Sequence, residues 1–114
     1  MSDDPTRSFL VQLPSSNDPD DMALLLRLEG EIGAALAGSG IGKTDGWDTG
    51  SGNMNVFSDV VPDRWEEALT LTRAILARAG VERDAVIAIS EGEGDDRTLR
   101  VVWPPDYDGL FRFF

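Results

Sequence analysis

Residues 41–62 have the sequence IGKTDGWDTGSGNMNVFSDVVP. The segment is rich in glycine, aspartate and asparagine, which favour turns because glycine has no Cβ and short polar side chains bond to nearby backbone. Short strands are expected on its two sides, over Ile41–Thr44 and Met54–Val60, with the tightest part of the turn at Gly50–Gly52. The segment therefore predicts a β-hairpin with a glycine-rich loop, whose register the sequence alone does not define.

An amphipathic helix is expected on each side of this hairpin. The first is predicted over Asp18–Ala37, which begins with a capping aspartate and ends before Gly38. The second is predicted over Asp63–Ala79, with Gly80 as its stop signal. Apolar residues at helical spacing predict two buried stripes, Leu25, Leu28, Ile32 and Leu36 in the first helix and Trp65, Leu69, Thr72, Ile75, Leu76 and Ala79 in the second.

Three further segments, Phe9–Leu13, Ala85–Ser90 and Leu99–Trp103, have the apolar patterns of strands. The resulting order, β-α-β-β-α-β-β, predicts an α+β fold: a ferredoxin-like sandwich with two helices on one face of an antiparallel sheet. The last strand is expected to extend an edge. Gly33 is expected to let the first helix approach the sheet closely.

The length of 114 residues favours a single domain over residues 1–114, with tails at 1–6 and 105–114. The second tail contains four large apolar residues, Leu110, Phe111, Phe113 and Phe114. Leaving such side chains in water is unfavourable, so we expect this tail to dock on its own sheet or on a second subunit. A homodimer formed through a sheet edge or through this tail is a corresponding expectation.

The composition narrows the classes of function. The chain has no cysteine and no histidine, so it lacks a thiolate nucleophile, a histidine base and the usual ligands of transition metals. Its net charge of −11 disfavours binding to nucleic acid or to an anionic membrane, and it fits solubility or attraction to a basic partner. The acidic N-terminus and the absence of a long apolar run favour a cytoplasmic location.

Residues 37–44, AGSGIGKT, resemble a relaxed P-loop. A phosphate-binding loop follows a strand and begins a helix, so that backbone N–H groups point at the phosphates. Here a helix is expected before the segment, which would present the opposite helix end. We therefore expect neither ATP nor GTP to bind, and no cofactor is predicted.

The predicted loop holds the candidate site residues. The oxygen-bearing side chains of Asp45, Asp48, Asn53 and Asn55 suggest either a calcium site or, more simply, side chains that bond to the backbone of the turn. Trp47 is either a contact anchor for a partner or an aromatic folded onto the sheet. All five are candidate partner-binding residues, and no catalytic or metal-binding residue is assigned.

The pattern Gly42-x-x-Asp45-Gly46-x-x-x-Gly50-x-Gly52-x-x-Asn55-x-Phe57, followed by a helix and a strand ending in Trp103-Pro104, resembles a group of small acidic bacterial ferredoxin-like domains. Most are uncharacterised, and some small acidic proteins of this kind are immunity proteins. The resemblance covers about Ile41–Pro104, and it departs where Pro62-Asp63 replaces the group's Asp-Pro. It implies a fold and carries no catalytic residues with it.

These observations predict that the protein is a non-enzymatic, acidic module that binds a basic partner protein. In the most specific version of this prediction, it is an immunity-like inhibitor of that partner. The alternative is a small-ligand or metal-binding domain that uses the Asp45–Asn55 loop. A small enzyme without histidine or cysteine is a third possibility. The loop distinguishes the first two, because ligand binding needs its oxygens to converge and protein binding needs Trp47 to be exposed.

Overall fold

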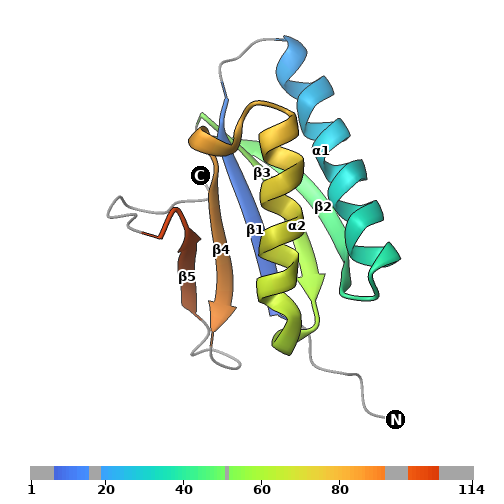
Figure 1. Ribbon diagram of the computed structural model, residues 1–114. Coiled ribbons are helices and arrows are strands. Elements are labelled where there is room, and N and C mark those ends of the chain that lie inside the picture. Colours follow the sequence, from blue (N-terminus) through green and yellow to red (C-terminus); the bar gives the residue numbers. More distant parts are fainter. Residues whose placement is uncertain (1–6, 16–18, 51, 92–97, 106–114) are drawn as a thin grey trace.

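The computed structural model describes residues 7–15, 19–50, 52–91 and 98–105 (Figure 1). Its elements, with η denoting a 3₁₀ helix, are β1 Arg7–Pro14, α1 Pro19–Gly38, β2 Gly42–Gly50, β3 Asn53–Val60, η1 Pro62–Arg64, α2 Trp65–Arg78, η2 Glu82–Asp84, β4 Val86–Glu91 and β5 Thr98–Trp103. The docking expected of the second tail stays a prediction, because residues 106–114 lie outside the described part of the chain.

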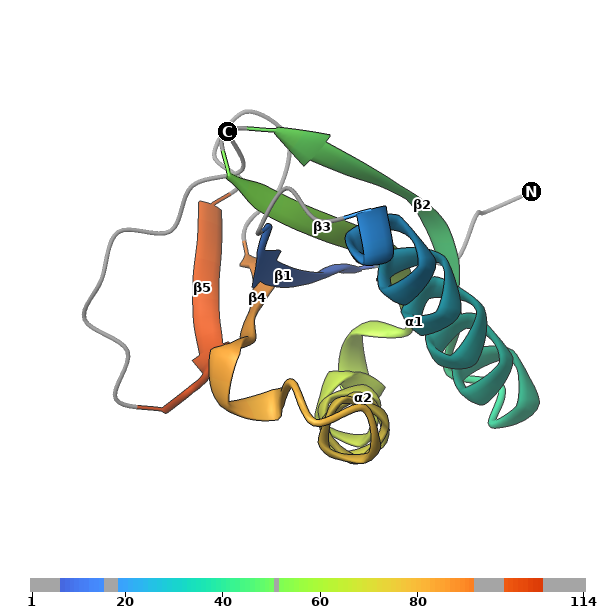
Figure 2. The same cartoon turned by 90° about the horizontal axis from the view of Figure 1, so that it is seen from above.

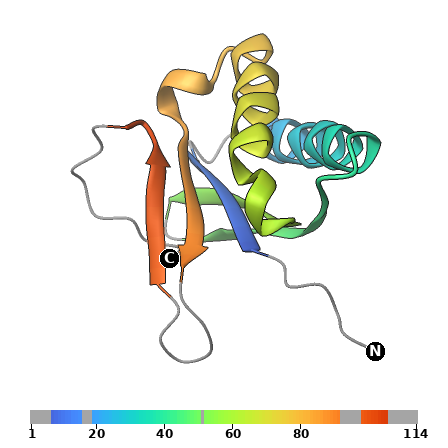
Figure 3. The same ribbon diagram turned by 60° about the horizontal axis from the view of Figure 1, so that its bottom comes forward.

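The five strands form one antiparallel sheet in the order β2-β3-β1-β4-β5. Figures 2 and 3 show both helices on the same side of this sheet. The predicted α+β class, with an antiparallel sheet and two helices, is confirmed. The arrangement is compatible with the ferredoxin-like class, and it has one strand more than the four of a plain ferredoxin-like sandwich.

The core lies between the sheet and the helices. Phe9, Val11 and Leu13 alternate along the central strand β1 and are 0–4% exposed. The predicted stripe of α1 is confirmed, because its four residues are each no more than 1% exposed. In α2 the fully buried residues are Ala68, Thr72, Ile75 and Leu76, whereas Trp65, Leu69 and Ala79 are partly buried against the same core.

Each helix is followed, two positions after its last residue, by a glycine with a left-handed backbone. After α1 this residue is Gly40, with a φ of 67°, two positions beyond the predicted Gly38. The Ile41 N–H donates to the Leu36 carbonyl at 2.9 Å, and a bond that spans five residues in this way needs the left-handed residue before Ile41. Gly80, with a φ of 77°, ends α2 in the same manner, as predicted.

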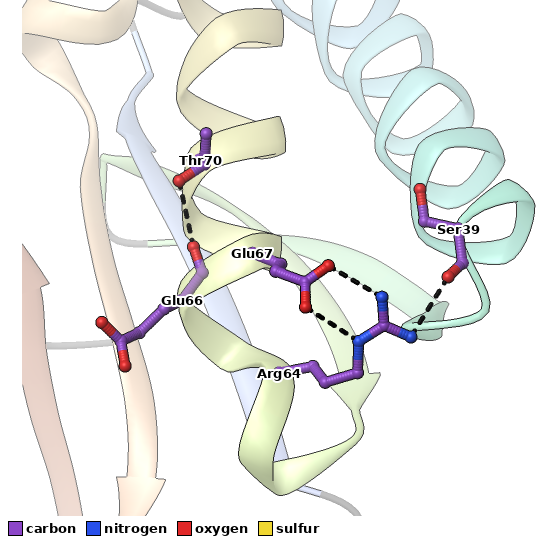
Figure 4. Close-up of polar contacts among 5 residues, drawn as sticks. All are labelled: Ser39, Arg64, Glu66, Glu67 and Thr70. Atoms are coloured by element: carbon purple, nitrogen blue, oxygen red, sulfur yellow. Dashed lines mark hydrogen bonds and ion pairs between the residues drawn. The ribbon is translucent and has the colours of Figure 1, made fainter.

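The second helical segment begins differently from the prediction. Residues Pro62–Arg64 form the 3₁₀ turn η1, and the α-helix starts at Trp65 instead of Asp63. Figure 4 shows how this turn is tied to the end of the first helix: Arg64 Nη1 donates to the Ser39 carbonyl at 3.3 Å. Arg64 also donates to both carboxylate oxygens of Glu67, at 3.0 and 2.7 Å.

The bidentate bond from Arg64 lowers the pKa of the Glu67 carboxyl below its ordinary value of 4.5 and raises the pKa of Arg64. The contribution of Glu67 to stability is therefore present above its ordinary pKa and is lost as the pH falls through the lowered pKa. The two side chains are 38% and 57% exposed, so solvent screening keeps this contribution small.

The glycine-rich loop is much shorter than the prediction. Residues 42–50 and 53–60 are paired strands, so the turn is confined to the two residues between them. Strand pairing overrides the low strand propensity of the glycines and aspartates in β2. Residues that were expected in a loop therefore lie on a sheet, where their faces are fixed by register.

Gly33 brings α1 close to β2, as expected. A Cβ built on Gly33 would lie 2.9 Å from Thr44 Oγ1 and 3.4 Å from Thr44 Cγ2. A Cβ on Gly30, one turn earlier in the same helix, would meet nothing within 4 Å. The two glycines therefore have different roles, although the sequence presents them alike.

Replacing each glycine with alanine tests this difference. Gly30→Ala should raise the free energy of unfolding by about 1 kcal/mol, because alanine is the better helix former. Gly33→Ala should instead lower the free energy of unfolding, because the added methyl group would force Thr44 to move. Urea unfolding of the two variants measures the difference, and equal stabilisation of both would show that α1 does not approach Thr44 closely.

Candidate functional site

An extra residue in β2 determines where the candidate side chains lie. Thr44 is opposite Ser58 and Gly46 is opposite Phe57, so Asp45 is inserted between the two pairs as a β-bulge. Gly46 has a φ of 112°, which side-chain-bearing residues rarely adopt. Such bulges turn a side chain away from regular alternation, and here the bulge exposes Asp45.

The bulge divides the five candidate residues between the two faces of the sheet. Trp47 lies opposite Val56, which is in the core, so it is on the helix side, where it is 39% exposed. Asp48 lies opposite Asn55 on the face away from the helices, here called the second face. Asn53 is half-buried at the start of β3. The five residues therefore do not form one surface.

Three polar side chains form a row across β1, β3 and β2 on the second face. Gln12 Nε2 donates to Asn55 Oδ1 at 3.0 Å, and Asn55 Nδ2 donates to Asp48 Oδ1 at 2.8 Å. Asn55 is 1% exposed and Gln12 is 8% exposed. Because buried amides need partners, this polar row favours one register of the three strands.

The polar row also bears on the calcium alternative. A calcium site requires several oxygen atoms to point at one position. Asn55 instead turns its NH₂ group toward Asp48, and its oxygen accepts a bond from Gln12. In the described ranges, no three acidic side chains gather in a way that could hold a metal ion.

A cavity of about 420 Å³ lies on the second face. Every strand contributes to it, and its lining residues are Ser8, Leu10, Asp45, Phe57, Ser58, Asp59, Ser90 and Leu99. The Ser8 N–H donates to Ser90 Oγ at 2.9 Å, and this bond joins β1 to β4 in the lining. Of the lining residues, the sequence pointed only to Asp45, because the others come together through cross-strand register.

The other two tryptophans are packed between α2 and β5. The Arg73 guanidinium lies 3.6 Å from the ring centre of Trp103, and Arg73 also pairs with Glu82 at 2.9 Å. Arg100 lies 5.5 Å from the ring centre of Trp65. These contacts hold the edge strand β5 against α2, so Trp65 and Trp103 have structural roles.

The P-loop-like segment has the context that was predicted for it. Helix α1 precedes the segment and strand β2 follows it, the reverse of a phosphate-binding loop. Lys43 lies in β2, opposite Asp59. The expectation that ATP and GTP do not bind stays a prediction.

No family model, curated protein or solved structure shows a significant match to this chain. Among the residues that the structure describes, no helix is long and apolar enough to cross a membrane.

The polar row predicts a specific stability effect. Asn55→Ala should lower the free energy of unfolding by roughly 1–3 kcal/mol, because the Gln12 amide and the Asp48 carboxylate lose their bonds to this residue. Asn53→Ala, at the more exposed asparagine of the same strand, is the control and should lose less. Equal losses in urea unfolding would contradict a special role for Asn55.

Proposed function

We propose that this protein is a non-enzymatic, acidic protein-interaction module that binds a basic partner protein. In the most specific version of the proposal, the protein is an immunity-like inhibitor that acts in the cytoplasm. Its fold is a ferredoxin-like sandwich. The observation that carries the proposal is the exposure of Trp47, which is 39% exposed on the edge strand β2. Partly exposed tryptophans are frequent anchors of protein interfaces.

The surroundings of Trp47 support an anchoring role. Helix α1 packs on β2, and two apolar residues on the outer side of α1, Met22 and Leu26, are 40% and 48% exposed. They are four positions apart and therefore lie on the same side of the helix. Together with Trp47, they give the α1–β2 side of the molecule three large apolar groups available to a partner.

The charge of the chain favours a basic partner. The net charge is −11, although Asp45 lines the second face and Trp47 lies on the helix side, so Asp45 is not beside the indole. Net negative charge attracts a basic surface over about 8 Å at physiological salt and mainly raises the association rate. The apolar anchor mainly lowers the dissociation rate.

Partner capture followed by binding kinetics tests the proposal. Wild-type protein, Trp47→Ala and Val61→Ala serve as matched baits, because Val61 is also 39% exposed. For the partner that is identified, Trp47→Ala should speed dissociation by roughly 30-fold, which corresponds to about 2 kcal/mol. Val61→Ala should bind like wild type.

The salt dependence of binding in the same complex tests whether charge attraction contributes to association. Raising the ionic strength should slow association far more than it speeds dissociation. An association rate that is independent of salt would contradict attraction between opposite charges. Equal dissociation rates for wild type and Trp47→Ala would contradict the anchoring role of the indole.

A further inference from the structure

The face of the sheet opposite the helices carries a row of apolar residues. Strand register places one residue from each of β3, β1, β4 and β5 in line across the sheet: Phe57, Leu10, Ala88 and Val101. Leu10 and Ala88 alternate with core residues of their strands, so this apolar row lies on the second face. The face of an antiparallel sheet that meets water is usually polar. An apolar row in this position is therefore unfavourable unless another segment covers it.

Polar groups border the apolar row on both sides. On one side is the polar row that includes Gln12 and Asn55. On the other side, Ser8 lies opposite Asp59 and is bonded to Ser90, and these residues line the cavity. The apolar row is therefore four strands wide but one residue deep along each strand. An occupant that matches it is a short segment that crosses the strands.

The middle of the apolar row is as buried as the core. Leu10 is 3% exposed and Ala88 is 0% exposed, whereas Leu13, which faces the helices, is 4% exposed. Both helices lie on the other side of the sheet (Figures 2 and 3), so they do not shield the second face. Neighbouring side chains on a sheet shield the flanks of a residue but not its outward end. A further segment of the chain is therefore needed to explain this burial.

The sequence distinguishes between the segments that could provide the cover. Four of the segments outside the described ranges, 1–6, 16–18, 51 and 92–97, have the sequences MSDDPT, SND, S and GEGDDR. Among them, Met1 is the single large apolar residue. The fifth, residues 106–114, has the sequence DYDGLFRFF, with one leucine and four aromatic residues. Composition therefore favours this C-terminal segment.

We propose that the C-terminal segment, residues 106–114, docks across the apolar row of its own chain. Four strands span three spacings of about 4.8 Å, or about 14 Å, and nine extended residues reach about 30 Å. The segment begins shortly after Trp103, in the same strand as Val101, so it starts beside the row. A short tether also gives it an effective concentration of about millimolar, which favours its own sheet over a second copy.

The docked segment closes the second face and leaves the α1–β2 side of the molecule to a partner. Trp47 lies on that other side, so this proposal does not rest on the proposed function. Trp47→Ala should leave the docked segment in place. Failure of one proposal is therefore distinguishable from failure of the other.

Nuclear Overhauser contacts in the unmodified full chain test the docking. We expect contacts from the phenylalanine rings of the C-terminal segment, each assigned separately from Phe57, to the methyl groups of Leu10 and Val101. The methyl groups of Leu26, exposed on the outer side of α1, are the control and should show none. Absence of contacts to Leu10 and Val101 would overturn the proposal, and this measurement needs no variant to fold.

A mixture of isotope-labelled and unlabelled chains distinguishes the chain's own segment from that of a second copy. The contacts should persist within single labelled chains. Contacts found only between labelled and unlabelled chains would assign the apolar row to a second copy and contradict docking within one chain.

Joint replacement of Phe111 and Phe113 with serine in the full chain gives a second test. Loss of the two rings should uncover the apolar row, so binding of the dye ANS, which reports exposed apolar surface, should rise severalfold while near-UV circular dichroism is retained. Leu26→Ser, at a residue that is already exposed, is the control and should cause no rise. Unchanged or weaker dye fluorescence in the double variant would contradict the proposal, because replacing rings that are free in water removes apolar surface.

Discussion

Side chains of a β-strand alternate between two faces, so the extra residue at Asp45 exchanges the faces of every residue that follows it in β2. With this bulge, Trp47 lies on the helix side and Asp48 lies beside Asn55. Uninterrupted pairing beyond Thr44 would turn Trp47 to the second face and remove Asp48 from Asn55. The exposed indole and the polar row therefore both depend on this single insertion.

The bulge follows from the way both ends of β2 are fixed. Nine residues of β2 pair against eight of β3, so one of them has no partner. At one end, a Cβ on Gly42 would overlap the Asp59 carbonyl oxygen and would lie 2.9 Å from Val60 Cα, so only glycine fits there. At the other end, Gly52 completes the turn with a φ of 85°. The extra residue, Asp45, therefore forms a bulge between these two ends, and the neighbouring Gly46 adopts the positive φ that the bulge needs.

Much of the helical structure could be predicted, because buried residues at helical spacing and terminal glycines are local signals. Two details of the helix ends differed from the prediction. The left-handed residue after α1 is Gly40 and not Gly38, because several glycines follow this helix and the sequence does not show which one is left-handed. The second helix starts at Trp65 and not at Asp63, because Pro62–Arg64 form a 3₁₀ turn. The extent of β2 could not be predicted, since pairing with β3 and not local propensity makes it a strand. The cavity was missed for a related reason: its residues come from all five strands, and only Asp45 drew attention by itself.

The register of β2 against β3 can be measured directly in solution by cross-strand nuclear Overhauser effects in a ¹⁵N-edited spectrum of the full chain. The bulged register predicts contacts that pair Trp47 with Val56 and Asp48 with Asn55. Contacts that pair Trp47 with Asn55 and Asp48 with Met54 would show an uninterrupted ladder. That result would contradict the bulge and, with it, the division of the candidate residues between two faces.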